Sequence, residues 1–172
     1  MDKFFSDIRS VLITTPDRWQ RLAQTLPDDL LQRKPKPGEW SALECLSHIM
    51  DTEAVFNFRI TCFLAGKDFS AFNPDTEGSK ASEQPGKDLA AELGRMRQAS
   101  LNVLETLSEA DLDRRARHAE LGPVTLRQML NEWAAHDLMH TVQAERALMQ
   151  PFIDECGPWQ SYFLDHWVGA QK

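Results

Sequence analysis

The chain has 172 residues, 42% of them apolar and 26% charged, with a formal net charge of −7. This composition is typical of one soluble globular domain, which we expect to span residues 1–172. The acidic balance argues against nucleic acid and anionic membrane surfaces as partners, because both select basic patches. The sequence shows neither a long uncharged apolar run nor the pattern of a secretory signal, so we expect a cytoplasmic protein with reduced cysteines.

Apolar residues at helical spacing predict a first helix near residues 4–26. Within it, Pro16 follows a threonine that resembles an N-cap, so we expect the helix to be broken or kinked at that proline. A second helix should begin after the rigid connector RKPKPGEW, at a capping box formed by Ser41 and Glu44. Gly66 should end this second helix.

Residues 66–88 are rich in glycine, proline, serine and charge, and the segment is too long for a simple turn. It carries two aromatic residues, Phe69 and Phe72, which need a docking place. We expect part of the segment to fold over the cleft as a lid or against a second subunit. The alternative is a mobile connector whose phenylalanines cap the edge of the core.

A third helix is expected at about residues 89–107, followed by a turn and an irregular stretch, HAELGPV. Strand signals are nearly absent. A fourth helix should start at a second capping box, Thr125 with Gln128, and end before Pro151. The aromatic tail beyond it should pack back as a short helix. The sequence therefore predicts an all-α fold: a four-helix bundle with a long crossover loop between helices two and three, plus short helical segments.

The inward face of the fourth helix changes from apolar to polar at its middle. Its positions, at spacings of three and four, are Leu126, Met129, Trp133, His136, His140, Gln143 and Ala147. Two histidines one turn apart can turn their ring nitrogens toward one point, which is how a helix presents two metal ligands. The alternative is a pair of core histidines that simply find hydrogen-bond partners.

A third histidine, His48, has small or apolar helical neighbours and should also face the interior. Facing helices of a bundle can bring three imidazoles together. Three neutral histidines suit a divalent transition metal such as Zn, Ni, Fe or Co, and they leave coordination positions open for water or substrate. We therefore expect His48, His136 and His140 to form a metal site.

Three polar residues are candidates for orienting a ligand or touching a substrate. Glu53 interrupts an apolar stripe and could hold a ligand histidine or pair with an arginine from another helix. Glu132 could orient His136, serve as a base, or lie on a solvated face. Gln143 could touch a bound ligand. The sequence assigns no catalytic side chain.

The remaining candidates are expected to lie at the surface or to have only a packing role. His118 and His166 lie in polar or terminal segments and should be at the surface. Asp137 should face a neighbouring helix or water, and Cys45 should pack in the core.

Two stretches together, PKPGEWSALECLSHIMDTE and LRQMLNEWAAHDLMHTVQAERAL, resemble the DinB superfamily of DinB and YfiT-like proteins. The family pattern is a Trp-Ser pair at the start of helix two, a histidine about seven residues later and HxxxH on the last long helix. The resemblance covers roughly residues 1–150, and the matching positions are Trp40, Ser41, His48, His136 and His140.

The resemblance implies a crossover four-helix bundle, a three-histidine metal site and a homodimer. It also implies an enzyme for a small-molecule substrate, namely a metal-dependent S-transferase of low-molecular-weight thiols. The same site could serve a metal-dependent hydrolase. The alternative from another class is a non-catalytic bundle, stress-related or structural, in which a metal or small ligand stabilises the fold.

Overall fold

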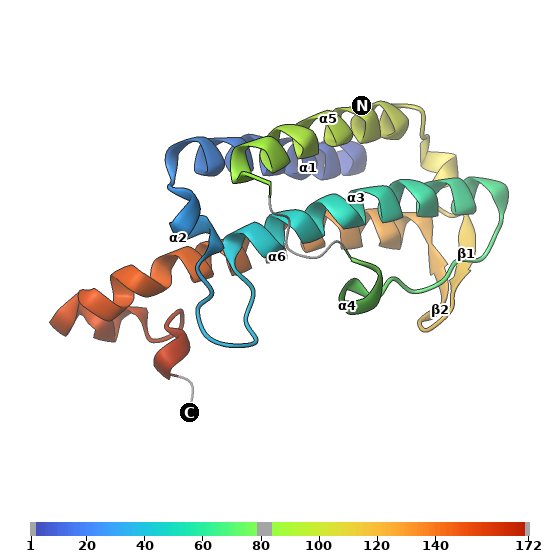
Figure 1. Ribbon diagram of the computed structural model, residues 1–172. Helices are drawn as coiled ribbons and strands as arrows, with labels where there is room; N and C mark the ends of the chain where they lie inside the picture. The colour runs from blue at the N-terminus through green and yellow to red at the C-terminus, as the bar shows by residue number, and fades with distance from the viewer. Residues whose placement is uncertain (1–2, 79–83, 171–172) are drawn as a thin grey trace.

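The computed structural model describes residues 3–78 and 84–170, and Figure 1 shows their arrangement. The long helices are α1 (Lys3–Thr25), α3 (Ala42–Ala65), α5 (Gly86–Glu105) and α6 (Leu126–Glu155). Contacts link α1 with α5, α5 with α3, α3 with α6 and α6 with α1, so they close a four-helix bundle. Successive long helices α1 and α3 lie on one diagonal, and α5 and α6 on the other. This crossover topology, predicted from the sequence, brings α3 beside α6.

Short elements fill the connections and the tail. They are α2 (Asp28–Gln32), α4 (Pro74–Glu77), η1 (Glu109–Asp111), β1 (Arg115–His118), β2 (Gly122–Thr125), η2 (Gly157–Phe163) and η3 (Val168–Ala170). The strands form an antiparallel hairpin in which Arg115 pairs with Thr125 and His118 with Gly122. The expectation of an irregular stretch here is wrong. Strands of four residues are too short for their alternation to show in the sequence.

The predicted helix starts are confirmed. At α3 the hydroxyl of Ser41 accepts from the Glu44 N–H at 3.2 Å, and the Glu44 carboxylate accepts from the Ser41 N–H at 2.8 Å. Thr125 and Gln128 repeat the arrangement at α6. Gly66 ends α3 with a φ of 62°, in the left-handed region that glycine tolerates best.

The expected break at Pro16 is wrong, because α1 runs through that residue without interruption. Proline has no N–H, so the carbonyl of Leu12, one turn earlier, loses its helical partner. Arg97 of α5 donates from Nη1 to this carbonyl at 2.6 Å. The neighbouring helix thus supplies the missing hydrogen bond, and α1 continues.

The expected end of α6 before Pro151 is also wrong, because the helix continues to Glu155. The last turn buries Ile153, which favours continuation over the cost of one lost hydrogen bond. The tail returns along α6 as 3₁₀ helices, and Gln150 accepts from the Val168 N–H at 2.8 Å. The tail therefore packs back as expected, although Tyr162 and several other large side chains stay exposed. No helix in the described part of the chain is both long and apolar enough to span a bilayer.

The core consists of two apolar clusters with a polar layer between them. Phe56 and Trp133 belong to one cluster, and Trp19 and Leu46 belong to the other. Between them on α3, α5 and α6 lie buried polar side chains, namely Glu53, Arg97, Ser100, Asp137, His48 and His140. The polar middle that the sequence showed in α6 therefore extends across the bundle.

Candidate metal centre

Three histidines meet in the polar layer, His48 from α3 and His136 and His140 from α6. One ring nitrogen from each lies within 4.8 Å of the others. The Nε2 atoms of His48 and His136 are 3.0 Å apart. The ring of His140 lies 4.4 Å, centroid to centroid, from each of the other two rings. We call these residues the histidine triad.

One ring of the triad is oriented by a hydrogen bond within its own helix. Nδ1 of His140 lies 2.8 Å from Oε1 of Gln143, which places the ring proton on Nδ1 and the free electron pair on Nε2. In contrast, the Nδ1 atoms of His48 and His136 are buried and have no hydrogen-bond partner among the described residues. Gln143 therefore orients the ring of His140, one of the roles that the sequence left open for it.

Aromatic side chains enclose the triad. Trp40 stacks on His140 with centroids 5.7 Å apart and meets His48 edge-on at 5.0 Å. Phe72 stacks on His48 at 6.4 Å. Part of the 66–88 segment thus lies against the site, as a lid would, while residues 79–83 lie outside the described part of the segment.

Burial keeps the triad neutral. Desolvation, with a further contribution from the neighbouring histidines, lowers the pKa of His48 to about 4 and that of His136 to about 3. Desolvation also lowers the pKa of His140, although the bond to Gln143 opposes it. Neutral imidazoles at pH 7 carry the free electron pairs that metal ligation requires.

The triad fits a divalent transition metal by geometry and by donor type. Two nitrogens that lie about 2.0–2.1 Å from one ion are about 2.9–3.4 Å apart for octahedral or tetrahedral angles. The 3.0 Å separation of the His48 and His136 nitrogens falls in this range. Cys45, one turn before His48, is not among the residues whose ligand atoms come together, and burial raises the pKa of its thiol to about 12. Three imidazole donors leave positions open for other molecules.

The sequence model of the DinB superfamily matches residues 12–144, a range that contains all three triad histidines. The chain belongs to the DinB superfamily. No curated protein matches the sequence. YfiT from Bacillus subtilis, described as a probable metal-dependent hydrolase with an unusual four-helix bundle topology, aligns with a TM-score of 0.75 and 16% identity, covering 86% of this chain and 87% of its own. A DinB-like protein from Bacillus subtilis, YjoA, aligns with a TM-score of 0.57 and 22% identity, covering 83% of this chain and 90% of its own.

At these identities, the structural neighbours establish the DinB-like fold, and the site must be read from this chain's own residues. Of the two roles left open for Glu53, the structure shows the pair with an arginine. Its carboxylate accepts from Arg97 Nε at 2.9 Å and from Nη2 at 2.8 Å. Asp137 faces the same arginine at 2.7 Å. Glu132 is half-exposed and lies toward Arg59, at 4.0 Å.

The expectation that His118 lies at the surface is wrong. The hairpin and the backbone pairing of Phe69 with Arg117 and Ala119 bury its ring. Nδ1 of His118 accepts from the backbone N–H groups of Glu120 and Leu121, at 3.2 and 3.3 Å. A hairpin signal in the sequence would have been needed to foresee this.

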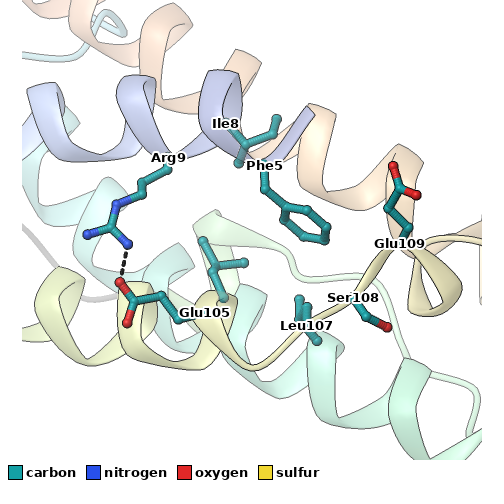
Figure 2. Close-up of a pocket in the computed structure, with 8 residues that line it drawn as sticks. Phe5, Ile8, Arg9, Glu105, Leu107, Ser108 and Glu109 are labelled. Carbon is teal, nitrogen blue, oxygen red and sulfur yellow. Dashed lines mark hydrogen bonds and ion pairs between the residues drawn. The ribbon is translucent and has the colours of Figure 1, made fainter. Parts of the chain in front are cut away.

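Several cavities, of about 300–420 Å³, have the volume of a small-ligand site. Two of them lie between α1 and α5, which carry no triad histidine, and one of these lies beside the Arg9–Glu105 ion pair (Figure 2). Two others have Phe72, which stacks on His48, in their lining. Of these, the cavity of about 340 Å³ is lined by residues from α3, α6, the hairpin and the 66–88 segment. Because it alone of the two borders α6, which carries two triad histidines, it is the candidate substrate site.

Proposed function

We propose that this DinB-superfamily chain is a metal-dependent enzyme that acts on a small molecule, with His48, His136 and His140 as the ligands of one divalent metal ion. The observation that carries the proposal is the meeting of three neutral imidazoles beside a cavity. Such an ion, when bound, supplies a Lewis acid and makes a nucleophile available at neutral pH. Zn, Ni, Fe and Co all suit this donor set.

The chain's own residues prepare the site. The triad offers three unprotonated donors, and Gln143 fixes the ring of His140 through its Nδ1–H. Trp40 and Phe72 cover faces of the triad with apolar surface and so limit access of water.

Two reactions fit this arrangement. Hydrolysis is supported by the description of YfiT, a protein of the same fold. Transfer of a low-molecular-weight thiol is supported by the family resemblance. In that reaction the thiol comes from outside, because no cysteine is among the described residues whose ligand atoms meet at the triad. Titrating a low-molecular-weight thiol into cobalt-loaded protein separates the two, since a sulfur-to-cobalt absorption band appears only if the thiol ligates the metal. A cobalt spectrum that ignores thiols and other small ligands favours the non-catalytic alternative.

The metal assignment has its own test. Protein that is reconstituted and desalted should hold about one divalent metal ion per chain. The His136→Ala, His140→Ala double variant should lose the metal, while the exposed His166→Ala control keeps it. Metal content that is equal in the double variant and the control would refute the assignment.

We also propose that the protein forms a homodimer. Leu138, Met139 and Val142 are 51%, 56% and 60% exposed on α6, which makes an apolar strip beside the polar layer. Such strips are commonly covered in assemblies. Light scattering should give twice the chain mass, and Val142→Lys should shift it toward the single-chain mass. A single-chain mass for the unaltered protein would contradict the proposal.

A further inference from the structure

The cavity of about 340 Å³ lies next to the triad, although no triad histidine lines it. Phe72 both lines the cavity and stacks on His48, with ring centroids 6.4 Å apart. Glu132, another lining residue, lies one turn before His136 on α6, which is about 6 Å along a helix axis. The cavity and the triad are thus neighbours that share a contact with Phe72.

The cavity wall contains a charged group whose hydrogen bonds are incomplete. Arg59 of α3 lines the cavity with a side chain that is only 12% exposed. Its guanidinium lies 5.8 Å from the ring centre of Phe56 and 5.3 Å from that of Phe69. The carboxylate of Glu132 is 4.0 Å away, which is beyond hydrogen-bond distance.

The Nε atom of Arg59 is buried and has no hydrogen-bond partner among the described residues. A buried donor without a partner costs free energy, and such donors are rare in folded proteins. The terminal nitrogens of the guanidinium are not among such buried donors and have no hydrogen bond within the described residues, so an acceptor in the cavity would meet them. A planar carboxylate matches the two parallel N–H groups that a guanidinium offers.

The other groups around the cavity limit the charge of that acceptor. Arg59 is the permanently charged cation of the lining, and the carboxylates of Glu120 and Glu132 lie in the same wall. One negative charge balances Arg59, whereas a second would face those carboxylates. His118 also lines the cavity, and since its Nδ1 accepts backbone hydrogen bonds, the neutral ring carries its proton on Nε2.

The rest of the lining is apolar. It consists of Phe69, Phe72, Leu121, Val124 and Met129. This surface suits an aromatic or branched aliphatic body attached to the anionic group.

We propose that the cavity binds an amphipathic monocarboxylate. Its carboxylate pairs with Arg59, and its apolar body packs against Phe72 and Met129. This assignment deepens the proposed function and rests on it for taking the bound molecule as a substrate. It names Arg59 as the residue that selects the substrate class.

The test uses metal-free protein and two probes of the same shape, 3-phenylpropanoate and its uncharged amide, 3-phenylpropanamide. Calorimetry should show that the acid binds about 10- to 100-fold more tightly than the amide, the factor expected for hydrogen bonds to a charged partner. In a parallel NMR titration, the guanidinium proton resonances of Arg59 should move downfield with the acid and not with the amide.

Variants then assign the selectivity to one residue. Arg59→Gln should bind the acid as weakly as the amide, and Arg59→Lys should retain part of the preference. Arg115→Gln removes an exposed arginine from the hairpin that lines the cavity and should leave the affinities for both probes unchanged. Circular dichroism checks that each variant is folded, and the comparison of the two probes on the unaltered protein needs no variant.

Equal affinity for acid and amide in the unaltered protein would overturn the proposal, as would full acid preference in folded Arg59→Gln. Tighter binding of 2-phenylethyl phosphate than of 3-phenylpropanoate would overturn the assignment to a single negative charge. Because the probes bind without metal, loss of acid preference alongside normal metal content refutes only this inference. Acid preference in a protein that takes up no metal refutes only the proposed metal centre.

Discussion

Replacing Arg97 tests what holds the polar layer together. Its side chain is 0% exposed and pairs with two buried carboxylates, Glu53 on α3 and Asp137 on α6. It also donates to the Leu12 carbonyl that Pro16 leaves free on α1. Arg97→Met keeps much of the volume but removes every one of these hydrogen bonds, so the variant buries two unpaired carboxylates and an unpaired carbonyl.

The expected loss is large for one substitution. Removing one partner of a buried ion pair costs about 3–5 kcal/mol, because a charge stays buried without compensation. In a domain of this size each kcal/mol lowers Tm by about 2–4 °C, so Tm should fall by about 6–20 °C. The matched control is Arg95→Met on the same helix, whose pair with Glu92 is 72% exposed on the arginine side. It should cost no more than about 0.5 kcal/mol.

Urea and thermal unfolding of metal-free protein measure both variants. Removing the two uncompensated charges identifies the cause. Adding Glu53→Gln and Asp137→Asn should restore part of the loss. A loss no greater than that of Arg95→Met, or no recovery of stability when both carboxylates are replaced, would refute the reasoning.

Three further predictions concern the triad and the thiols. Gln143→Leu should weaken metal binding about 10- to 100-fold by freeing the ring of His140, and an effect equal to that of the exposed Gln98→Leu would contradict this. The triad pKa values lie below the unfolded value of 6.5, so metal-free protein should lose stability as pH falls from about 6.5 toward 4; an equal or higher urea midpoint at pH 5 than at pH 7 would argue against it. Iodoacetamide at pH 8 should alkylate Cys156 in the folded protein and spare Cys45, which is buried with a pKa of about 12. Equal labelling of the two cysteines in mass spectrometry would contradict this prediction.

The bundle helices and the shared face of His136 and His140 were accessible from the sequence because both depend on local periodicity. Capping boxes at Ser41 and Thr125 mark where α3 and α6 begin, and spacings of three and four identify the inward face. His136 and His140 share that face by helix geometry alone. Their meeting with His48 required the crossover topology, which the length of the 66–88 segment suggested.

The parts that sequence reasoning missed depend on contacts between distant segments. Pro16 is a helix breaker by its own chemistry, and only Arg97, far along the chain, supplies the bond that lets α1 continue. In the sequence, His118 looks like a loop residue. In the structure it ends the four-residue strand β1, which pairs with β2, and the ring of Phe69 packs beside it. Arg97 itself carries a signal that could have been used, since it stands four residues after Leu93 and four before Leu101 on the buried stripe of α5.

The two buried ion pairs of Arg97 lie close to the triad along both helices that carry its histidines. Asp137 is next to His136 on α6, and Glu53 follows His48 on α3 by little more than one helical turn. One guanidinium, Arg97, binds both carboxylates, so it fixes the register of the two helices that carry the histidines. Apolar side chains alone would tolerate small shifts between these helices, whereas paired hydrogen bonds to a planar guanidinium do not. The 3.0 Å separation of the facing His48 and His136 nitrogens thus depends on a third helix, α5, that contributes no histidine to the site.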